Sequence, residues 1–96
     1  MTYANSTERE ALISGLRSLA DYLEASPEVP APSYSDVFIF PPDGTDAERR
    51  AEIDLIAAQI GETPENVCGH YVVTRNFGPV QYRAVAIPRD NDTSGK

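Results

Sequence analysis

The sequence predicts a small α+β domain in which two helices pack on one face of a three-stranded antiparallel sheet. Two segments carry apolar residues at helical spacing behind a capping signature, and they span residues 7–26 and 45–60. Three short segments are rich in β-branched and aromatic residues, as strands are, and they span residues 36–40, 69–75 and 80–87. The expected element order is therefore α-β-α-β-β.

The length of the chain predicts one domain. A chain of 96 residues has material for one hydrophobic core and not for two. We therefore expect residues 1–96 to form a single domain that is ordered from about residue 7 to residue 88. The polar segment 89–96, which follows Pro88, is expected to be a flexible tail.

The first helix is predicted to begin at Thr7, because Thr7 and Glu10 have the spacing of a capping box. Gly15 lies in its middle at a cost of about 1 kcal/mol relative to alanine, which indicates close approach of another element. Proline disfavours helical geometry in the preceding residue, so the helix should end at Ser26-Pro27. The apolar stripe consists of four leucines at steps of four, three and four residues: Leu12, Leu16, Leu19 and Leu23.

A proline-rich segment, residues 27–35, is expected to be an extended connector to the first strand. In that strand, residues 36–40 (DVFIF), four apolar residues stand in a row, which predicts that both faces are at least partly covered. The second helix should begin with a capping box at Thr45 and Glu48 and end at Gly61. Residues 62–66 are expected to be a loop, with a single helical turn after Thr63 as the alternative.

The last third of the sequence predicts a hairpin. Pro79 has no N–H with which to close a two-residue Phe-Gly turn, so we expect a four-residue loop between Arg75 and Val80. This register places Val73 opposite Tyr82. The strand 80–87 is expected in the centre of the sheet, between 36–40 and 69–75, with antiparallel contacts on both sides. The predicted core consists of Leu16, Leu19, Leu23, Ile53, Ile56, Ile60, Phe38 and Val73.

Composition and charge restrict the class of function. The net charge of −7 argues against direct binding of nucleic acid or of anionic membranes. The apolar runs are far shorter than the ~20 residues that span a bilayer, and residues 1–9 lack the apolar stretch of a signal peptide, so a cytoplasmic protein is expected. One cysteine and one histidine do not provide a disulfide or a four-ligand zinc site, and we expect no metal and no cofactor.

Catalytic motifs are not recognisable in the sequence. Cys68 and His70 would lie on the same side of a strand, but such side chains are ~7 Å apart, too far for a direct hydrogen bond. We therefore predict no catalytic residue, and a non-enzymatic protein. A small enzyme that uses His70 or Cys68 is kept as an alternative.

Charge is distributed unevenly along the chain and points to a binding surface. Residues 1–65 contain thirteen acids and four bases, whereas residues 66–89 contain three arginines and no acid. If both helices cover one face of the sheet, the other face is bare. Its mixture of apolar and polar residues with an arginine is typical of transient or homodimeric interfaces. The candidate residues on this face are His70, Val72, Thr74, Gln81, Arg83 and Val85.

Three stretches of the chain resemble a group of short, uncharacterised proteins of actinobacteria and their phages and mobile elements. They read SGLRSLADYLEASPEVPAP, AERRAEIDLIAAQIG and GHYVVTRNFGPVQYRAVAIP, and the resemblance extends from about Leu12 to Pro88. The group has no established activity, so the resemblance implies an origin and supplies no mechanism. The phage connection favours a protein that binds a host or phage component.

The sequence thus favours a small accessory protein that binds another protein, or a second copy of itself, through its sheet and hairpin. An alternative is an acidic mimic of DNA that blocks a DNA-binding protein. The acids here are dispersed, with arginines between them, and they are sparse beside the phosphates of DNA.

Overall fold

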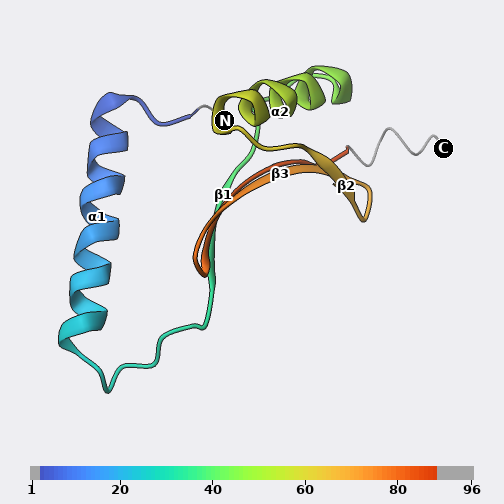
Figure 1. Ribbon diagram of the computed structural model, residues 1–96. Helices are drawn as coiled ribbons and strands as arrows, with labels where there is room; N and C mark the ends of the chain where they lie inside the picture. Colours follow the sequence, from blue (N-terminus) through green and yellow to red (C-terminus); the bar gives the residue numbers. More distant parts are fainter. Residues whose placement is uncertain (1–2, 89–96) are drawn as a thin grey trace. The chain divides into compact units, whose positions relative to one another are not determined.

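The computed structural model describes residues 3–88 and confirms the α+β class (Figure 1). The chain divides into two compact units, residues 3–33 and residues 34–88, and each is described by itself. The first holds helix α1 (Ser6–Ala25), and the second holds helix α2 (Asp46–Ile60) and a sheet. The prediction of a single domain stays a prediction, and the predicted tail, 89–96, lies outside the described residues.

Helix α1 begins two residues earlier than the sequence analysis predicted. The capping box is formed by Asn5 and Glu8: the Glu8 N–H donates to Asn5 Oδ1 at 2.8 Å, and the Asn5 N–H donates to Glu8 Oε1 at 2.9 Å. Asparagine is as good an N-cap as threonine, and it lies upstream, so the helix gains a half turn. The helix ends at Ala25 before Ser26, as predicted.

Helix α2 has both predicted ends. Its N-cap is Thr45, whose Oγ1 accepts from the Glu48 N–H at 3.1 Å, while the Thr45 N–H donates to the Glu48 carboxylate at 2.8 Å. Hydrogen bonding of the Glu48 carboxylate to the Thr45 backbone N–H, and to a lesser extent to the Thr45 side chain, lowers the pKa of Glu48. Gly61 ends the helix in the left-handed conformation, with φ of 72°.

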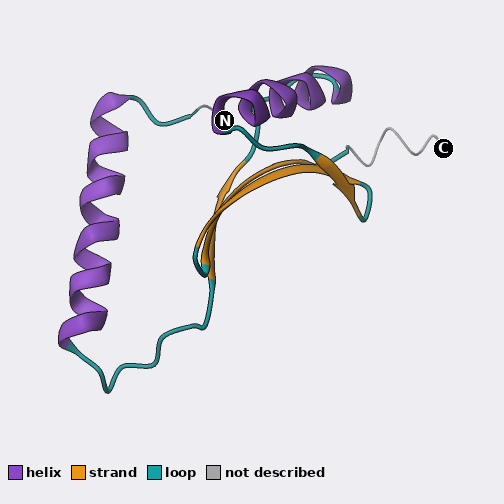
Figure 2. Cartoon of the chain, viewed as in Figure 1, coloured by secondary structure: helices purple, strands orange, loops and turns teal. Residues whose placement is uncertain are grey.

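The sheet has four strands and is mixed, whereas three antiparallel strands were predicted. The strands are β1 (Ser35–Ile39), β2 (Glu65–Val67), β3 (His70–Phe77) and β4 (Val80–Ala86), in spatial order β1-β4-β3-β2. The predicted neighbours are therefore right, with β4 between β1 and β3. The predicted direction is wrong, because β1 runs parallel to β4 (Figure 2).

Strand β2 causes this difference. It has three exposed residues, two of them polar, so it carries no hydrophobic pattern that marks a strand. It pairs with β3 through a two-residue turn at Cys68 and Gly69, both with positive φ (53° and 85°). Such turns usually contain Asn-Gly or Asp-Gly, and Cys-Gly does not signal one. Because β2 is antiparallel to β3, this extra strand reverses the direction of the chain once more than the prediction allowed. Strands β3 and β4 therefore run opposite to their predicted directions relative to β1.

The hairpin between β3 and β4 is tighter than predicted. Phe77 pairs with Val80, so Gly78 and Pro79 form a two-residue loop, and Val73 lies opposite Ala84 instead of Tyr82. Gly78 has a φ of 61°, and proline fixes φ near the value that the second loop residue of a type II′ turn adopts. The second loop residue of such a turn does not donate the hydrogen bond that closes it, so the missing N–H of Pro79 costs nothing. The register differs from the predicted one by two residues, so every side chain stays on its predicted face.

Helix α2 covers one face of the sheet, as predicted. The Tyr71 hydroxyl donates to Asp54 Oδ1 at 2.5 Å, and Arg75 Nη1 donates to the Ile60 carbonyl at 2.8 Å. Tyr71, Val73 and Arg75 alternate along β3, and so they define the face that contacts α2. The prediction that α1 covers the same face stays a prediction, because α1 belongs to the other unit.

The core lies between α2 and this face. Ile53, Ile56 and Ala57 of α2 are buried, and so are Val73, Ala84 and Ala86 beneath them. The alanines let the helix approach the sheet closely. Of the predicted core, Ile53, Ile56 and Val73 are confirmed and Ile60 is half-buried. Phe38 was placed there wrongly: it is 51% exposed on the opposite face. In α1, Leu16 and Leu19 are exposed and Leu23 is half-buried.

Candidate functional site

The face of the sheet opposite α2 holds all six candidate binding residues. Val72 pairs with Val85 and Thr74 pairs with Arg83, while His70 and Gln81 keep the same alternation on their strands. We call this surface the open face, because in residues 34–88 the one helix, α2, lies on the other side. The structure brings the six residues together on one surface but does not test what they bind.

Strand β1 extends the open face with residues that the sequence analysis did not assign to it. In the parallel register Asp36 lies beside Gln81 and Phe38 beside Arg83. The rings of Phe38 and Phe40 stack, with centroids 6.0 Å apart, and both rings are exposed. The signal was present in the sequence: in DVFIF, residues 36, 38 and 40 share one face. The run of four apolar residues concealed it, because it suggested burial on both sides.

Burial is graded across the open face. Val72 and Val85 are each 6% exposed and form its apolar centre, and His70, Thr74, Gln81 and Arg83 are half-buried. Arg83 Nη2 donates to Gln81 Oε1 at 3.0 Å. Arg83 Nε and Asp36 Oδ1 are buried and have no hydrogen-bond partner. The open face thus combines buried apolar residues at its centre, exposed aromatic rings, and polar atoms that have no hydrogen-bond partner.

On the α2 side, Arg50, Tyr71 and Asp54 are paired with one another, whereas Arg49 Nε is buried without a hydrogen-bond partner, as Arg83 Nε is. Arg50 lies 4.1 Å from the centroid of the Tyr71 ring, and the Tyr71 hydroxyl donates to Asp54. The hydrogen bond to Asp54, then burial, then the charge of Asp54 raise the pKa of Tyr71, and Arg50 opposes them. These contacts fasten α2 to β3, so we assign them a structural role.

The Tyr71 contact predicts a stability change at alkaline pH. Because folding raises the pKa of Tyr71 above 10.0, its contribution is complete below that pH and is lost as the pH rises through the folded-state value. Wild type should therefore be more stable than Tyr71→Phe at about pH 8, and this advantage should shrink at about pH 11. Urea denaturation of both proteins at the two pH values measures it. An advantage that stays constant or grows would contradict the assignment.

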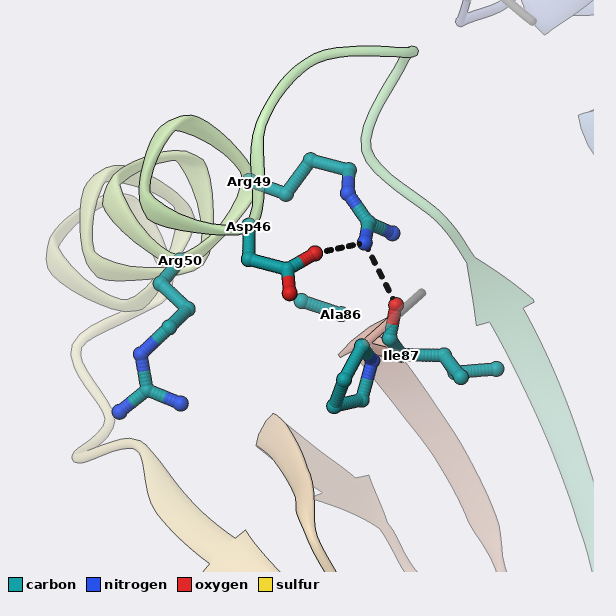
Figure 3. Close-up of a pocket in the computed structure, with 6 residues that line it drawn as sticks. Asp46, Arg49, Arg50, Ala86 and Ile87 are labelled. Carbon is teal, nitrogen blue, oxygen red and sulfur yellow. Dashed lines mark hydrogen bonds and ion pairs between the residues drawn. The ribbon is translucent and has the colours of Figure 1, made fainter. Parts of the chain in front are cut away.

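Two of the pockets on the described surface lie beside α2, and both are small. One, of about 100 Å³, lies where the start of α2 meets the end of β4 (Figure 3). In it Arg49 Nη2 donates to Asp46 Oδ1 at 2.7 Å and to the Ile87 carbonyl at 2.6 Å, so the cation fastens α2 to β4. The other, of about 250 Å³, lies beside Pro41 and Pro42. Both are below the ~300–1,000 Å³ usual for small-molecule sites.

Cys68 and His70 lie on different elements of the structure. Cys68 lies exposed in the turn between β2 and β3, not on a strand, so the assumption that both side chains project from one strand was wrong. Residues 3–88 contain no cluster of three potential metal ligands. They also contain no helix whose length and apolar character would suit a bilayer.

No protein-family model, no curated protein and no solved structure shows significant similarity to this chain.

Proposed function

We propose that this chain is a non-enzymatic accessory protein that binds another protein through the open face. Following the resemblance, we propose an actinobacterial or phage origin, a cytoplasmic location and a host or phage protein as the partner. The observation that carries the proposal is the stacked, exposed pair Phe38–Phe40 beside Arg83 on a sheet face that α2 does not cover.

The composition of the open face is that of an interface centre. Aromatic residues and arginine dominate the residues that contribute most binding energy in protein complexes, and they act in patches from which water is excluded. Phe38 supplies the aromatic surface and Arg83 supplies the cation, while Val72 and Val85 are already buried in the free chain and support the surface from beneath. Because Phe38 has the neighbouring Phe40 ring stacked on it, its orientation is already restricted before binding, which lowers the entropic cost.

The unused hydrogen-bonding groups support the same conclusion. A buried polar atom without a partner costs about 1–3 kcal/mol, and a bound protein can recover this cost only if the side chain turns outward to meet the group that the partner supplies. Asp36 requires a donor and Arg83 Nε requires an acceptor. A partner surface with apolar groups at its centre, an acidic group near Arg83 and a donor near Asp36 fits this face.

Two substitutions on the open face should abolish capture of the partner. We expect wild-type protein, immobilised and exposed to an actinobacterial lysate, to retain a specific protein that Phe38→Ala and Arg83→Glu do not retain. Removing an aromatic or arginine anchor costs at least about 2 kcal/mol, which lowers affinity ~30-fold. The retained proteins are compared by mass spectrometry.

Matched controls use the same chemical changes elsewhere. Leu55→Ala removes an apolar side chain of similar exposure (53%, against 51% for Phe38) from α2. Arg17→Glu makes the same charge reversal on α1. Both controls should capture the partner. Failure of wild type to retain any protein, or equal retention by all variants, would contradict the proposal. If the partner were released by DNA and retained by Arg83→Glu, mimicry of DNA would replace it.

A further inference from the structure

Helix α1 has an apolar stripe that its own unit does not cover. Residues 3–33 contain no other helix or strand, and no residue of α1 is buried. Leu12, Leu16 and Leu19 are 52%, 45% and 53% exposed. A single helix of 20 residues is marginally stable in water, and contiguous exposed apolar surface marks an interaction site. The stripe therefore requires a partner surface, and its chemistry indicates which one.

The stripe is free of charge over its whole length. The charged residues between residues 10 and 24 lie about 110° or more around the helix from the middle of the leucine row, at 100° per residue. They are Glu10, Arg17, Asp21 and Glu24. The seam that remains alternates steps of four and three residues, as the a and d positions of a coiled coil do. A second apolar helix fits this seam better than the open face, which carries polar groups.

The spacing of the leucines is the same in both directions along the chain. Steps of four, three and four residues are symmetric about a point between Arg17 and Ser18. When a second copy lies antiparallel about a two-fold axis at that point, Leu12 meets the other copy's Leu23 and Leu16 meets its Leu19. Every leucine of one helix then has a leucine partner. Such a contact is isologous, because both copies use the same surface, and so the assembly stops at a dimer.

Two further features distinguish antiparallel from parallel pairing. At the edge of the antiparallel seam, Gly15 lies beside Tyr22 of the other copy, and a Cβ at Gly15 would have no atom within 4 Å in the single chain. This gives the mid-helix glycine a purpose, since it leaves room for the tyrosine ring. In a parallel pair, by contrast, Arg9 would lie in the seam against its own copy, which costs electrostatic energy.

We propose that two copies of this chain associate through α1 as an antiparallel helix pair, with Leu12, Leu16, Leu19 and Leu23 as its seam. This inference concerns a different surface from the open face and does not depend on it. A dimer of this kind carries two open faces, joined to the paired helices by the proline-containing connectors. Two linked binding faces raise the apparent affinity for a partner with repeated sites.

Sedimentation equilibrium of the full chain tests the pairing. Wild type is expected to be dimeric at about 100 µM, and Leu16→Glu is expected to raise the dissociation constant at least ~100-fold, because it places a carboxylate in an apolar seam. Arg17→Glu, one residue away and outside the seam, should remain dimeric. Circular dichroism checks that the sheet unit of each variant stays folded. A monomeric wild type would overturn the proposal, as would a Leu16→Glu variant that dimerises like wild type.

Cysteine pairing tests the direction of the helices. In a Cys68→Ser background, the variant with both Leu12→Cys and Leu23→Cys is expected to form a covalent dimer on oxidation, whereas Leu12→Cys alone is expected not to. Covalent dimerisation of the Leu12→Cys variant alone would indicate parallel helices and would overturn the antiparallel arrangement. The absence of cross-linking in the double variant, despite a dimer in sedimentation, would overturn the assigned seam.

Discussion

Replacing Ile53 by alanine is expected to lower the free energy of unfolding by about 2–5 kcal/mol. Ile53 is fully buried between α2 and the sheet, so the substitution removes buried apolar atoms and leaves a cavity. A small domain has a total stability of only about 5–15 kcal/mol, so the loss is a large share of it. Urea denaturation followed by circular dichroism measures the change.

Leu55→Ala is the control for Ile53→Ala, because Leu55 lies two residues further along α2 and is exposed. Its effect should stay below about 0.5 kcal/mol, as is usual for surface positions. Equal losses for the two variants would show that α2 does not pack on the sheet through Ile53.

Replacing Ala84 by leucine is expected to cost about 1–3 kcal/mol, because the enlarged side chain has no space to occupy. Ala84 is fully buried in the central strand β4, between Val73 of β3 and Ile39 of β1. Leucine here would push α2 away from the sheet or force neighbouring side chains out of their preferred rotamers. Thermal and urea denaturation both report the loss.

Ala58→Leu makes the same enlargement on an exposed position of α2 and should be close to neutral. If Ala84→Leu were instead stabilising, a void would lie between α2 and β4. That outcome would contradict the close approach of helix and sheet on which the core depends.

Helix α2 could be predicted almost completely from the sequence because its signals are local. Thr45 and Glu48 define its start, Gly61 its end, and Ile53 and Ile56 its buried side. The start of α1 was misplaced for a local reason too, since both Asn5–Glu8 and Thr7–Glu10 have the spacing of a capping box. Both boxes were available in the sequence, and the upstream one forms.

The direction of the strands could not be predicted in the same way, because it depends on a strand that leaves no pattern. Residues 65–67 are too few and too polar to show alternation, and Cys68 conceals the turn that follows. Missing one strand changed the direction of every later strand. The faces of the hairpin survived this error, because the predicted and observed registers differ by two residues.

The candidate site was therefore predicted in part. The six residues of β3 and β4 share the open face in the structure, since alternation along a strand can be read from sequence alone. The contribution of β1 could not be predicted, because a run of apolar residues does not show which of its faces is covered. Only the position of α2 places Val37 and Ile39 on the helix side of the sheet and Phe38 on the open face.

Hydroxyl-radical footprinting of the purified complex with the captured protein is the most direct test of the open face as a binding surface. Phe38 and Leu55 are almost equally exposed in the free chain and lie on different surfaces of it. A change in the reactivity of one of them can therefore be compared with the reactivity of the other. We expect Phe38 and Phe40 to become protected in the complex while Leu55 and Phe77 react as in the free protein. Protection of Leu55 with no protection of Phe38 would contradict the account and place the binding surface on α2.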